Sequence, residues 1–390
     1  MIYFDQSATS LWKPDGVGRA IQDALRTGGN AGRGAHGAAL VSGRMDFKVR
    51  KQVARFFGAP DPAHVIFTSG ATESLNIALF GLLEAGDHAV TTWMEHNSVL
   101  RPLYALERRG VEVSVVSPQR DCGVRPVSVE DLRELVRPAT KLIAITHGSN
   151  VLGFVQDIRA IGEFCADRGI LLIVDASQTA GLLSINMADM GIACLCSSAH
   201  KSLLGPQGLG VMILGRGIRP APLIFGGTGA DSFASAMPES LPERYEAGTL
   251  NTPGIAGLGA GMDYLESYNI DNLHADAMRL AGLFYQGAVA IPGLTVYGDA
   301  PGRVCGAGIP VVSLNVADRG SGEVADTLWQ RAEIAVRPGA HCAPLVHEAL
   351  NTVAQGMVRF SFSHRNTEQE VIRALSELKE LAEEGERRDG

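Results

Sequence analysis

Apolar and polar residues follow two alternating patterns along most of the chain. Short, nearly continuous apolar runs are separated by longer segments in which apolar residues recur about every three to four positions. The first pattern is typical of parallel strands buried on both faces, and the second of helices with one buried face. The predicted strands are residues 65–68, 88–93, 111–116, 142–146, 169–175, 192–198 and 209–214. The predicted helices between them are residues 71–83, 99–108, 129–136 and 158–167.

Strands that alternate with helices predict an α/β fold with a mostly parallel, doubly wound sheet. Before this sheet we expect an extended arm over residues 1–14 and helices over residues 15–27 and 44–57. The segment between these helices, residues 30–43, is rich in Gly and Ala. We predict that it is an active-site loop, and we include its residue His36 among the candidate substrate-binding residues.

The pattern changes in residues 226–251, which are rich in Gly, Ser and Pro and are predicted to be loop. The segments that follow are predicted as helices 254–268 and 273–290, strand 311–316, helix 322–331, strand 358–362 and helix 367–383. They suggest a smaller α+β domain. We therefore predict an N-terminal arm (residues 1–14), a large domain (15–253) and a small C-terminal domain (254–390).

Length and composition favour a globular protein of two domains. The chain has 390 residues, which exceeds the size at which a single core usually stops growing. A net charge of −8 without a dense Lys/Arg run argues against binding to nucleic acid. No window approaches the roughly 20 apolar residues of a membrane span. No signal peptide is evident either, so we expect no membrane partner and a cytoplasmic location.

The six cysteines form no Cys-x-x-Cys pair. Cys194 and Cys196 lie in a predicted apolar strand, where a role in the core is favoured over a metal site. We therefore predict no metal and, in the cytoplasm, reduced thiols.

An acid and a lysine stand at the ends of two neighbouring predicted strands. The run before Asp175 ends at this acid, and the next run is followed by Lys201. Ligands of parallel sheets bind outside the carboxyl ends of the strands, so both residues are expected to face one pocket. Pyridoxal phosphate (PLP) needs such a pair, with a lysine for the Schiff base and a carboxylate at the ring nitrogen. Either residue alone is better explained as a helix cap or a surface lysine, but Gln178 and His200 nearby favour the cofactor site.

Further residues suit the remaining parts of this cofactor. Ala71 and Thr72 open a predicted helix directly after a strand, where free backbone N–H groups and the hydroxyl can bind a phosphate. Ser198 and His200 flank the same region and can add donors. His96 lies just past a strand end, where it can stack on the pyridine ring, and Gln178 can donate to the phenolic oxygen. Each has a simpler explanation alone: a capped helix start, a loop histidine, or a surface glutamine.

The whole set of motifs resembles the class V aminotransferase family, and within it the cysteine desulfurases and selenocysteine lyases. The resemblance covers nearly the whole chain. Its motifs, in order, are Tyr3-Phe4-Asp5-Gln6-Ser7-Ala8-Thr9, Ser69-Gly70-Ala71-Thr72-Glu73, Glu95-His96-Asn97, Ser149-Asn150-Val151-Leu152-Gly153, Asp175-Ala176-Ser177-Gln178, Ser198-Ala199-His200-Lys201, residues 246–253, Arg337-Pro338-Gly339-Ala340-His341-Cys342-Ala343-Pro344 and Val358-Arg359-Phe360-Ser361-Phe362.

The resemblance implies a fold type I PLP enzyme that forms a homodimer. By the same resemblance, Thr249 would reach the phosphate of the partner subunit's cofactor. Asn150 would lie near the cofactor and the substrate carboxylate, and Arg359 would bind that carboxylate with its planar guanidinium. Ser7 would lie near the substrate, where the family more often has an alanine in Asp-Asn-Ala-Ala-Thr; this departure leaves the details of substrate preference open.

Cys342 decides which reaction is expected. It lies among small residues with His341 beside it, and a neighbouring cation or dipole would favour the thiolate that acts as a nucleophile. In the desulfurases that this segment resembles, the cysteine attacks the sulfur of the substrate and carries it away as a persulfide. The sequence around Cys342 is similar to the short-loop branch that includes the selenocysteine lyases. Ala340 replaces a more usual histidine or leucine, which can change thiol activation.

The expected function is therefore PLP-dependent conversion of L-cysteine to L-alanine, with the sulfur left on Cys342 and passed to a possible protein acceptor. Lys201 would hold the cofactor and move protons, and His96 would assist. Three alternatives stay open within the family: a selenocysteine lyase, a cysteine β-lyase, and an aminotransferase or epimerase. An alternative from another class is a non-catalytic sulfur-relay protein, which would not need Lys201, Asp175, His96 and Gln178 together.

Overall fold

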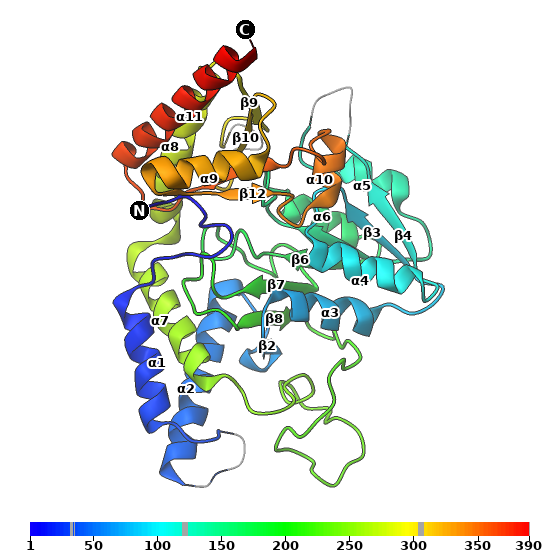
Figure 1. Cartoon of the computed structure of the whole chain (residues 1–390). Helices are drawn as coiled ribbons and strands as arrows, with labels where there is room; N and C mark the ends of the chain where they lie inside the picture. Colours follow the sequence, from blue (N-terminus) through cyan, green and yellow to red (C-terminus); the bar gives the residue numbers. More distant parts are fainter. Residues whose placement is uncertain (32–33, 35, 119–123, 303–307, 390) are drawn as a thin grey trace.

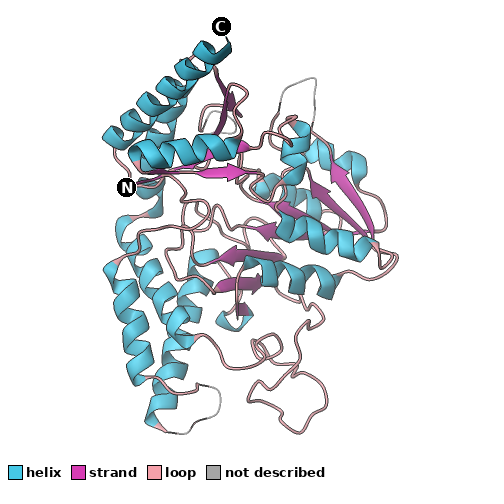
Figure 2. Ribbon diagram, viewed as in Figure 1, coloured by secondary structure: helices cyan, strands magenta, loops and turns pink. Residues whose placement is uncertain are grey.

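The fold is built around a seven-stranded sheet in the computed structural model, which describes residues 1–31, 34, 36–118, 124–302 and 308–389 (Figures 1 and 2). The strand order is β2-β8-β7-β6-β5-β3-β4. The strands are β2 (Val65–Thr68), β3 (His88–Thr92), β4 (Glu112–Val116), β5 (Thr140–Thr146), β6 (Leu171–Asp175), β7 (Cys194–Ser198) and β8 (Gly210–Leu214). Strand β8 runs antiparallel to its neighbours, whereas β3 to β7 are parallel. The predicted α/β fold with a mostly parallel sheet is confirmed.

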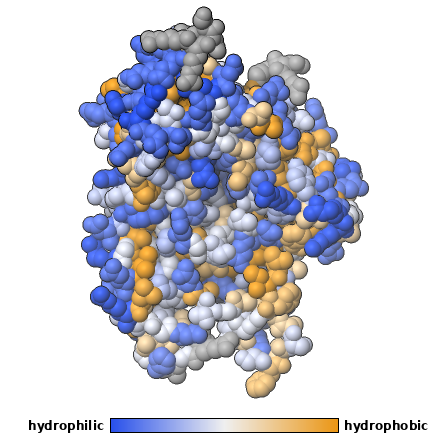
Figure 3. Space-filling model, viewed as in Figure 1, coloured by the Kyte–Doolittle hydropathy of each residue, from blue (hydrophilic) through white to orange (hydrophobic). Residues whose placement is uncertain are grey.

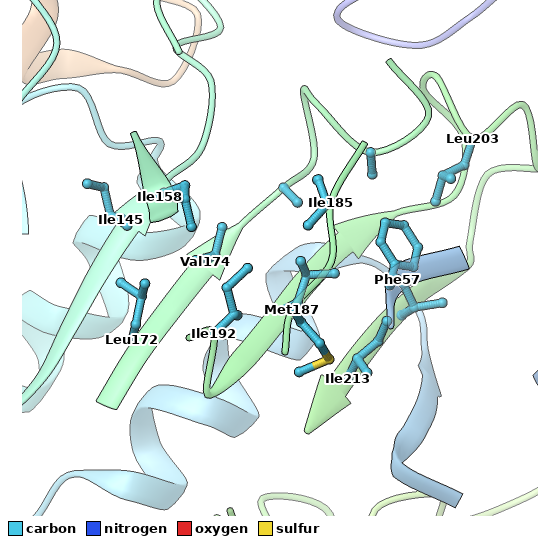
Figure 4. Close-up of a cluster of buried hydrophobic side chains, with 14 of the residues drawn as sticks. Phe57, Ile145, Ile158, Leu172, Val174, Ile185, Met187, Ile192, Leu203 and Ile213 are labelled. Atoms are coloured by element: carbon cyan, nitrogen blue, oxygen red, sulfur yellow. The ribbon is translucent and has the colours of Figure 1, made fainter. Parts of the chain in front are cut away.

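Helices cover both faces of this sheet. They are α1 (Asp15–Thr27), α2 (Gly37–Phe57), α3 (Ala71–Leu82), α4 (Asn97–Glu107), α5 (Val129–Leu135), α6 (Ile158–Ala166) and α7 (Thr252–Tyr268). Side chains alternate along a strand, so Leu172 and Val174 of β6 enter the core with α2, α5, α6 and α7. Ile173 enters the opposite core with α3 and α4. Figure 4 shows part of the first core, in which Ile185, Met187 and Ile192 lie between Leu172 and Val174 on one side and Phe57 and Ile213 on the other.

Double coverage explains why these strands are almost entirely apolar. Each fully buried Val, Leu or Ile contributes roughly 1.5–3 kcal/mol relative to an exposed one. Polar residues also stand at the carboxyl ends of three strands, where Thr146, Asp175 and Ser198 end β5, β6 and β7.

A second unit packs beside the carboxyl ends of the central sheet. Its antiparallel sheet has the order β12-β13-β10-β9. Its strands and helices are β9 (Leu294–Tyr297), β10 (Val311–Val316), β12 (Arg337–Gly339), β13 (Met357–Ser361), α8 (Ile270–Val289), α9 (Ser321–Ala332), α10 (Pro344–Ala349) and α11 (Glu368–Asp389). A separate core joins Phe284 of α8, Phe360 of β13 and Phe4 of the N-terminal arm.

The N-terminal arm connects the two units. Strand β1 (Ile2–Tyr3) pairs in parallel with β11 (Ile334–Ala335) beside the second sheet, and the arm then runs toward the central sheet (Figure 1). Helix α7 packs against α1 and α2, and its buried residues belong to the core of the central sheet. The predicted boundary between residues 253 and 254 would assign most of α7 to the small domain, and this boundary stays a prediction.

The predicted loop over residues 30–43 was wrong in its second half. Helix α2 begins at Gly37 instead of residue 44 and ends at Phe57, followed by Gly58 as a C-cap in the left-handed conformation (φ +64°). The run Ala38-Ala39-Leu40-Val41 favours the helix, and Ala39 and Ser42 are buried at helical spacing. His36 precedes the helix as its N-cap. The short elements β1, β9, β11, β12 and α10 were not predicted, because their apolar runs are too brief to show a period.

The visible surface mixes polar and apolar residues, and two of the cysteines lie in the core. Figure 3 shows hydrophilic and hydrophobic residues intermixed on the visible face. In the described part of the chain no helix combines the length and the apolar character that crossing a bilayer requires. Cys194 and Cys196 are fully buried, as predicted for residues of the core. Cys122 and Cys305 lie outside the described residues.

Candidate active site

A cavity of about 410 Å³ lies at the carboxyl ends of β5, β6 and β7, where Arg359 of β13 and the turn before α10 also reach it. Twelve of the predicted site residues line it: Ser7, Ala71, Thr72, His96, Asn150, Asp175, Gln178, Ser198, His200, Lys201, Cys342 and Arg359. Thr249 and His36 do not. Thr249 lines a different cavity of about 730 Å³, and His36 is exposed at the start of α2.

Lys201 follows β7 and Asp175 ends the adjacent parallel strand β6, as the sequence predicted. Burial lowers the pKa of Lys201 to about 8, an effect that the nearby Asp175 carboxylate partly opposes. The Oδ1 atom of Asp175 accepts the backbone N–H of Ser177 at 2.9 Å. An amine with this pKa is partly neutral at neutral pH, which suits a nucleophile.

The N-terminal arm holds the peptide that carries Lys201. The carbonyl oxygen of His200 accepts the backbone N–H of Ser10 at 3.1 Å and the ammonium of Lys13 at 2.7 Å. The hydroxyl of Ser10 donates to the carbonyl of Lys201 at 2.8 Å. Burial lowers the pKa of Lys13 to about 8. Sequence reasoning missed both residues, because the arm shows no periodic pattern; a lone lysine just before Pro14 was the only signal.

Glu95 is a second residue that the sequence analysis did not select by itself. It is fully buried, and burial raises its pKa to about 8. Its carboxyl group accepts the hydroxyl of Thr92 at 2.5 Å and the backbone N–H of Thr146 at 2.8 Å. Glu95 is thus mainly protonated at neutral pH, so it ties the His96 segment to the end of β5 without placing a second negative charge near Asp175.

His96 is held as a neutral imidazole. Its Nδ1 atom accepts the backbone N–H of Ser98 at 3.0 Å, so the ring proton lies on Nε2. Burial lowers the pKa of His96 below its ordinary value. A neutral ring in this position suits stacking on an aromatic ligand. Ser98 was not predicted; its hydroxyl also bonds that of Thr72 at 2.8 Å.

The start of α3 has backbone N–H groups that suit an anion. Ala71 and Thr72 form its first turn, and the backbone N–H of Ala71 donates to Ser198 Oγ at 3.3 Å. First-turn N–H groups have no partner within the helix, so they are available to a phosphate. His200 Nδ1 and Ser177 Oγ are buried nearby without a hydrogen-bond partner among the described residues.

Gln178 and Ser7 are linked across the cavity wall. The side-chain amide of Gln178 donates to the carbonyl of Ser7 at 3.1 Å, and the backbone N–H of Ser7 donates to Ser361 Oγ at 2.9 Å. The second N–H of the Gln178 amide is available to a ligand. The structure therefore brings Ser7, predicted near the substrate, to the same wall as the cofactor candidates.

Arg359 is buried, and its guanidinium is only partly satisfied. It donates to Asp5 Oδ1 at 3.0 Å and to the carbonyl of Asn150 at 3.1 Å. Its Nε atom is buried without a partner in the part of the chain that the structure describes. Arg337, which was not predicted as a site residue, lines the cavity on the same side. A carboxylate entering here would complete the hydrogen bonds of Arg359.

Cys342 lies in the turn between β12 and α10 and is exposed. His341 and Cys342 both have positive φ angles, +51° and +55°. Two hydrogen bonds of 2.7 Å fix this turn: Asn150 Nδ2 donates to the carbonyl of His341, and the backbone N–H of Asn97 donates to the carbonyl of Cys342.

His341 cannot be the cation expected beside the thiol. Burial, together with the Arg359 guanidinium, lowers the pKa of His341 to about 3, so its ring is neutral at neutral pH. Its Nε2–H donates to the carbonyl of Arg337 at 3.0 Å. This hydrogen bond occupies the ring proton, so the ring is poorly placed to transfer a proton to or from the thiol. Lys201 interacts electrostatically with Cys342 and, when protonated, can supply that cation.

The chain matches the family described as "Aminotransferase class-V" over residues 2–374. It is 34% identical to a probable cysteine desulfurase of Methanothermobacter thermautotrophicus, over 98% of this chain and 94% of that protein. A cysteine desulfurase structure from Thermococcus onnurineus, solved in its apo form, has a TM-score of 0.88 and 31% identity, with 98% and 94% coverage. A cysteine desulfurase structure from Escherichia coli has a TM-score of 0.83 and 26% identity, with 98% and 94% coverage.

Proposed function

The chain belongs to the class V aminotransferase family, and from this premise we propose that it is a PLP-dependent cysteine desulfurase. The observation that carries the proposal is one cavity lined by a lysine amine, a strand-end aspartate, a buried arginine and an exposed cysteine: Lys201, Asp175, Arg359 and Cys342. The curated relatives named as cysteine desulfurases, alike over nearly their full length, support the same reaction.

The residues of the cavity fit PLP, the cofactor of this family. Asp175 would pair with the ring nitrogen, His96 would stack on the ring, and Gln178 would donate to the phenolic oxygen. The phosphate would lie at the start of α3, where Ala71, Thr72, Ser198 and His200 offer donors; His200 Nδ1 is a buried atom with no partner among the described residues. When bound, the cofactor supplies a carbonyl that captures amines and an electron sink for the α-carbon.

The residues of the chain would then divide the work on L-cysteine. Arg359 binds the substrate carboxylate through the hydrogen bonds that its guanidinium lacks here, and Ser7 and Asn150 border the same space. The amine of Lys201 takes and returns protons at the substrate carbon atoms. The thiolate of Cys342 attacks the substrate sulfur, the carbon–sulfur bond breaks, and alanine leaves while the sulfur stays on Cys342 as a persulfide.

We also propose that the protein is a homodimer. Thr249 does not reach the cavity of its own chain, which suits its expected contact with the cofactor of a second copy. The segment that leads to Thr249 exposes several large apolar side chains: Leu223, Ile224, Phe225 and Phe233. Exposed apolar residues in this number are typical of an interface.

The substrate-binding role of His36 and the cytoplasmic location stay predictions, which mutagenesis and cell fractionation would test.

The test of the function compares the wild type with the Cys342→Ala variant. Purified wild type should show a visible cofactor absorbance and release equal amounts of alanine and sulfide from L-cysteine in the presence of a reducing thiol. Cys342→Ala should keep the absorbance but lose sulfide and alanine formation. Full desulfuration by Cys342→Ala would overturn the proposal, and pyruvate in place of alanine would indicate a β-lyase.

A further inference from the structure

Cys342 lies where two cavities meet. The active-site cavity is on one side, and on the other a second cavity of about 360 Å³ runs over the outer faces of α3 and α4. Both are lined by Thr72, His96, Ser98 and Cys342, so they adjoin at these residues. We name the second cavity the outer groove; its other lining residues are Asn76, Phe80, Asn97, Arg101, Pro102 and Ala105.

The outer groove reaches Cys342 without passing Lys201 or Arg359. Neither of these residues lines it, whereas both line the active-site cavity that the cofactor and substrate would fill. The turn of Cys342 is also fastened at both carbonyl groups, by Asn150 and by the backbone of Asn97. Because the turn is held in place, Cys342 does not carry its sulfur to a distant acceptor. The acceptor must instead enter the groove and reach Cys342.

The charge in the outer groove is positive. Arg101 projects from the first turns of α4, is exposed, and has no acidic partner within ion-pair distance in the described ranges. It acts electrostatically on His96, which lines the groove together with Cys342. Among the described residues, no Asp or Glu lines the groove. An anionic ligand would thus find a cation free to pair with it.

We propose that the outer groove admits the thiol that receives the sulfur from Cys342, and that it prefers a small thiol bearing a carboxylate. The inference rests on the proposed function. The acceptor thiolate attacks the outer sulfur of the persulfide, the sulfur–sulfur bond breaks, and Cys342 leaves as a thiolate. The proton given up by the acceptor thiol goes to Cys342. The products are a free Cys342 thiol and an acceptor persulfide, so no external oxidant or reductant is needed.

The test uses three acceptors of similar size and different charge: 3-mercaptopropionate (negative), 2-mercaptoethanol (neutral) and cysteamine (positive). The holoenzyme is loaded with sulfur by one equivalent of L-cysteine, and the rate of discharge of Cys342 is measured for each thiol. Each rate is divided by the fraction of the thiol that is ionised at the assay pH. It is then divided by the rate at which the same thiol reacts with a free small-molecule persulfide, which removes differences in intrinsic reactivity. The wild type should favour 3-mercaptopropionate over 2-mercaptoethanol about two- to five-fold, the range of an exposed ion pair, and less at high salt.

The Arg101 variants make the proposal falsifiable. The ratio of the two rates should fall to about one in Arg101→Gln and favour cysteamine in Arg101→Glu, as expected when an ion pair is removed or reversed. Arg108→Gln is the matched control: Arg108 is exposed at the other end of α4 and does not line the groove, so the ratio should equal that of the wild type.

Three results would overturn the inference, each in a different way. Equal corrected rates for all three thiols in the wild type would show that charge plays no part in acceptor binding. The KM for L-cysteine can also be measured in Arg101→Gln. If this KM rises by the same factor by which the ratio of discharge rates falls, the groove is the entrance for the substrate instead of the acceptor. Failure of wild-type Cys342 to take up sulfur at all would instead refute the proposed function on which the inference depends.

Discussion

Lys201 and Cys342 reach one cavity from two different parts of the molecule. Lys201 follows a strand of the central sheet, and its peptide is held by an arm from the start of the chain. Cys342 belongs to the second unit and lies in a short turn that is exposed. The residue that would hold the cofactor thus lines a cavity and is half-buried, whereas the residue that would carry sulfur is exposed.

The two residues also differ in backbone conformation. Cys342 and His341 are both in the left-handed region, which costs roughly 1–2 kcal/mol for a residue with a side chain. The hydrogen bonds from Asn150 and Asn97 to the carbonyl groups of the turn offset this cost. Lys201 has no positive φ, and charge and hydrogen bonds from the arm hold its peptide instead. The comparison teaches that contacts distant in sequence hold both residues, and that at Cys342 these contacts also maintain a strained backbone.

The largest effect should come from removing the enclosed amine. Lys201→Ala is expected to abolish the visible cofactor absorbance and all turnover, because no other cavity residue offers a primary amine. Absorbance spectra and labelling with pyridoxyl after borohydride reduction measure this. Lys379→Ala, at an exposed lysine of α11, is the control and should behave as the wild type. Retained absorbance in Lys201→Ala would contradict the assignment.

The arm should matter next. Lys13→Met removes the ammonium that binds the carbonyl of His200, and a hydrogen bond to a charged group contributes about 1.5–3 kcal/mol. We expect kcat to fall about tenfold or more, together with a shifted cofactor absorbance maximum. Lys13→Arg keeps the charge and should restore most of the rate. Equal losses in the two variants, with unchanged spectra, would mean that Lys13 serves packing alone.

The pH dependence of cofactor binding can sharpen the comparison. The pKa of Lys201 is lowered from 10.5 to about 8, so the neutral amine that captures the cofactor increases as pH rises through 8 and is nearly complete above 9. The rate of PLP uptake by the apo form should rise about tenfold from pH 7 to pH 9 and then level off. Stopped-flow absorbance measures this rate. A rise that continues to pH 10.5 would indicate an ordinary, exposed lysine.

A smaller effect is expected when the turn of Cys342 is loosened. Asn150→Ala removes one neutral hydrogen bond to the carbonyl of His341 but keeps the backbone carbonyl that binds Arg359. The rate of sulfur transfer to Cys342 should fall about two- to tenfold, with little change in the cofactor absorbance. Single-turnover alanine formation gives the rate. An increase in KM alone would assign the Asn150 side chain to substrate binding, not to the turn.

Local patterns predicted most of the large elements. Helix α1 has the predicted bounds, and the strands that end at Asp175 and before Lys201 were recognised by their apolar runs. The start of α2 was placed seven residues too late, at residue 44 instead of 37, because Gly-rich composition was given more weight than the apolar spacing within it. Strand β12 was missed because three residues cannot show a period.

For the candidate site, the sequence identified residue types but not their contacts. Twelve of the proposed residues lie in one cavity, yet the roles of Lys13, Glu95, Ser98 and Arg337 were not visible. His341 looked like a possible cation in the sequence, and burial makes it neutral. Charge state depends on solvent exposure, which no local pattern reports.

The sequence by itself determined the alternation of strands and helices, the polar strand ends and the chemistry that Lys201, Asp175 and Cys342 can perform. These are properties of residue type and of spacing within a few positions. Only the tertiary structure decided that Asp5 pairs with Arg359 across 354 positions, that the arm fastens the peptide of Lys201, and that Cys342 faces two cavities. The reason is physical: such contacts depend on how packed elements bring distant segments together, and burial then sets their charges.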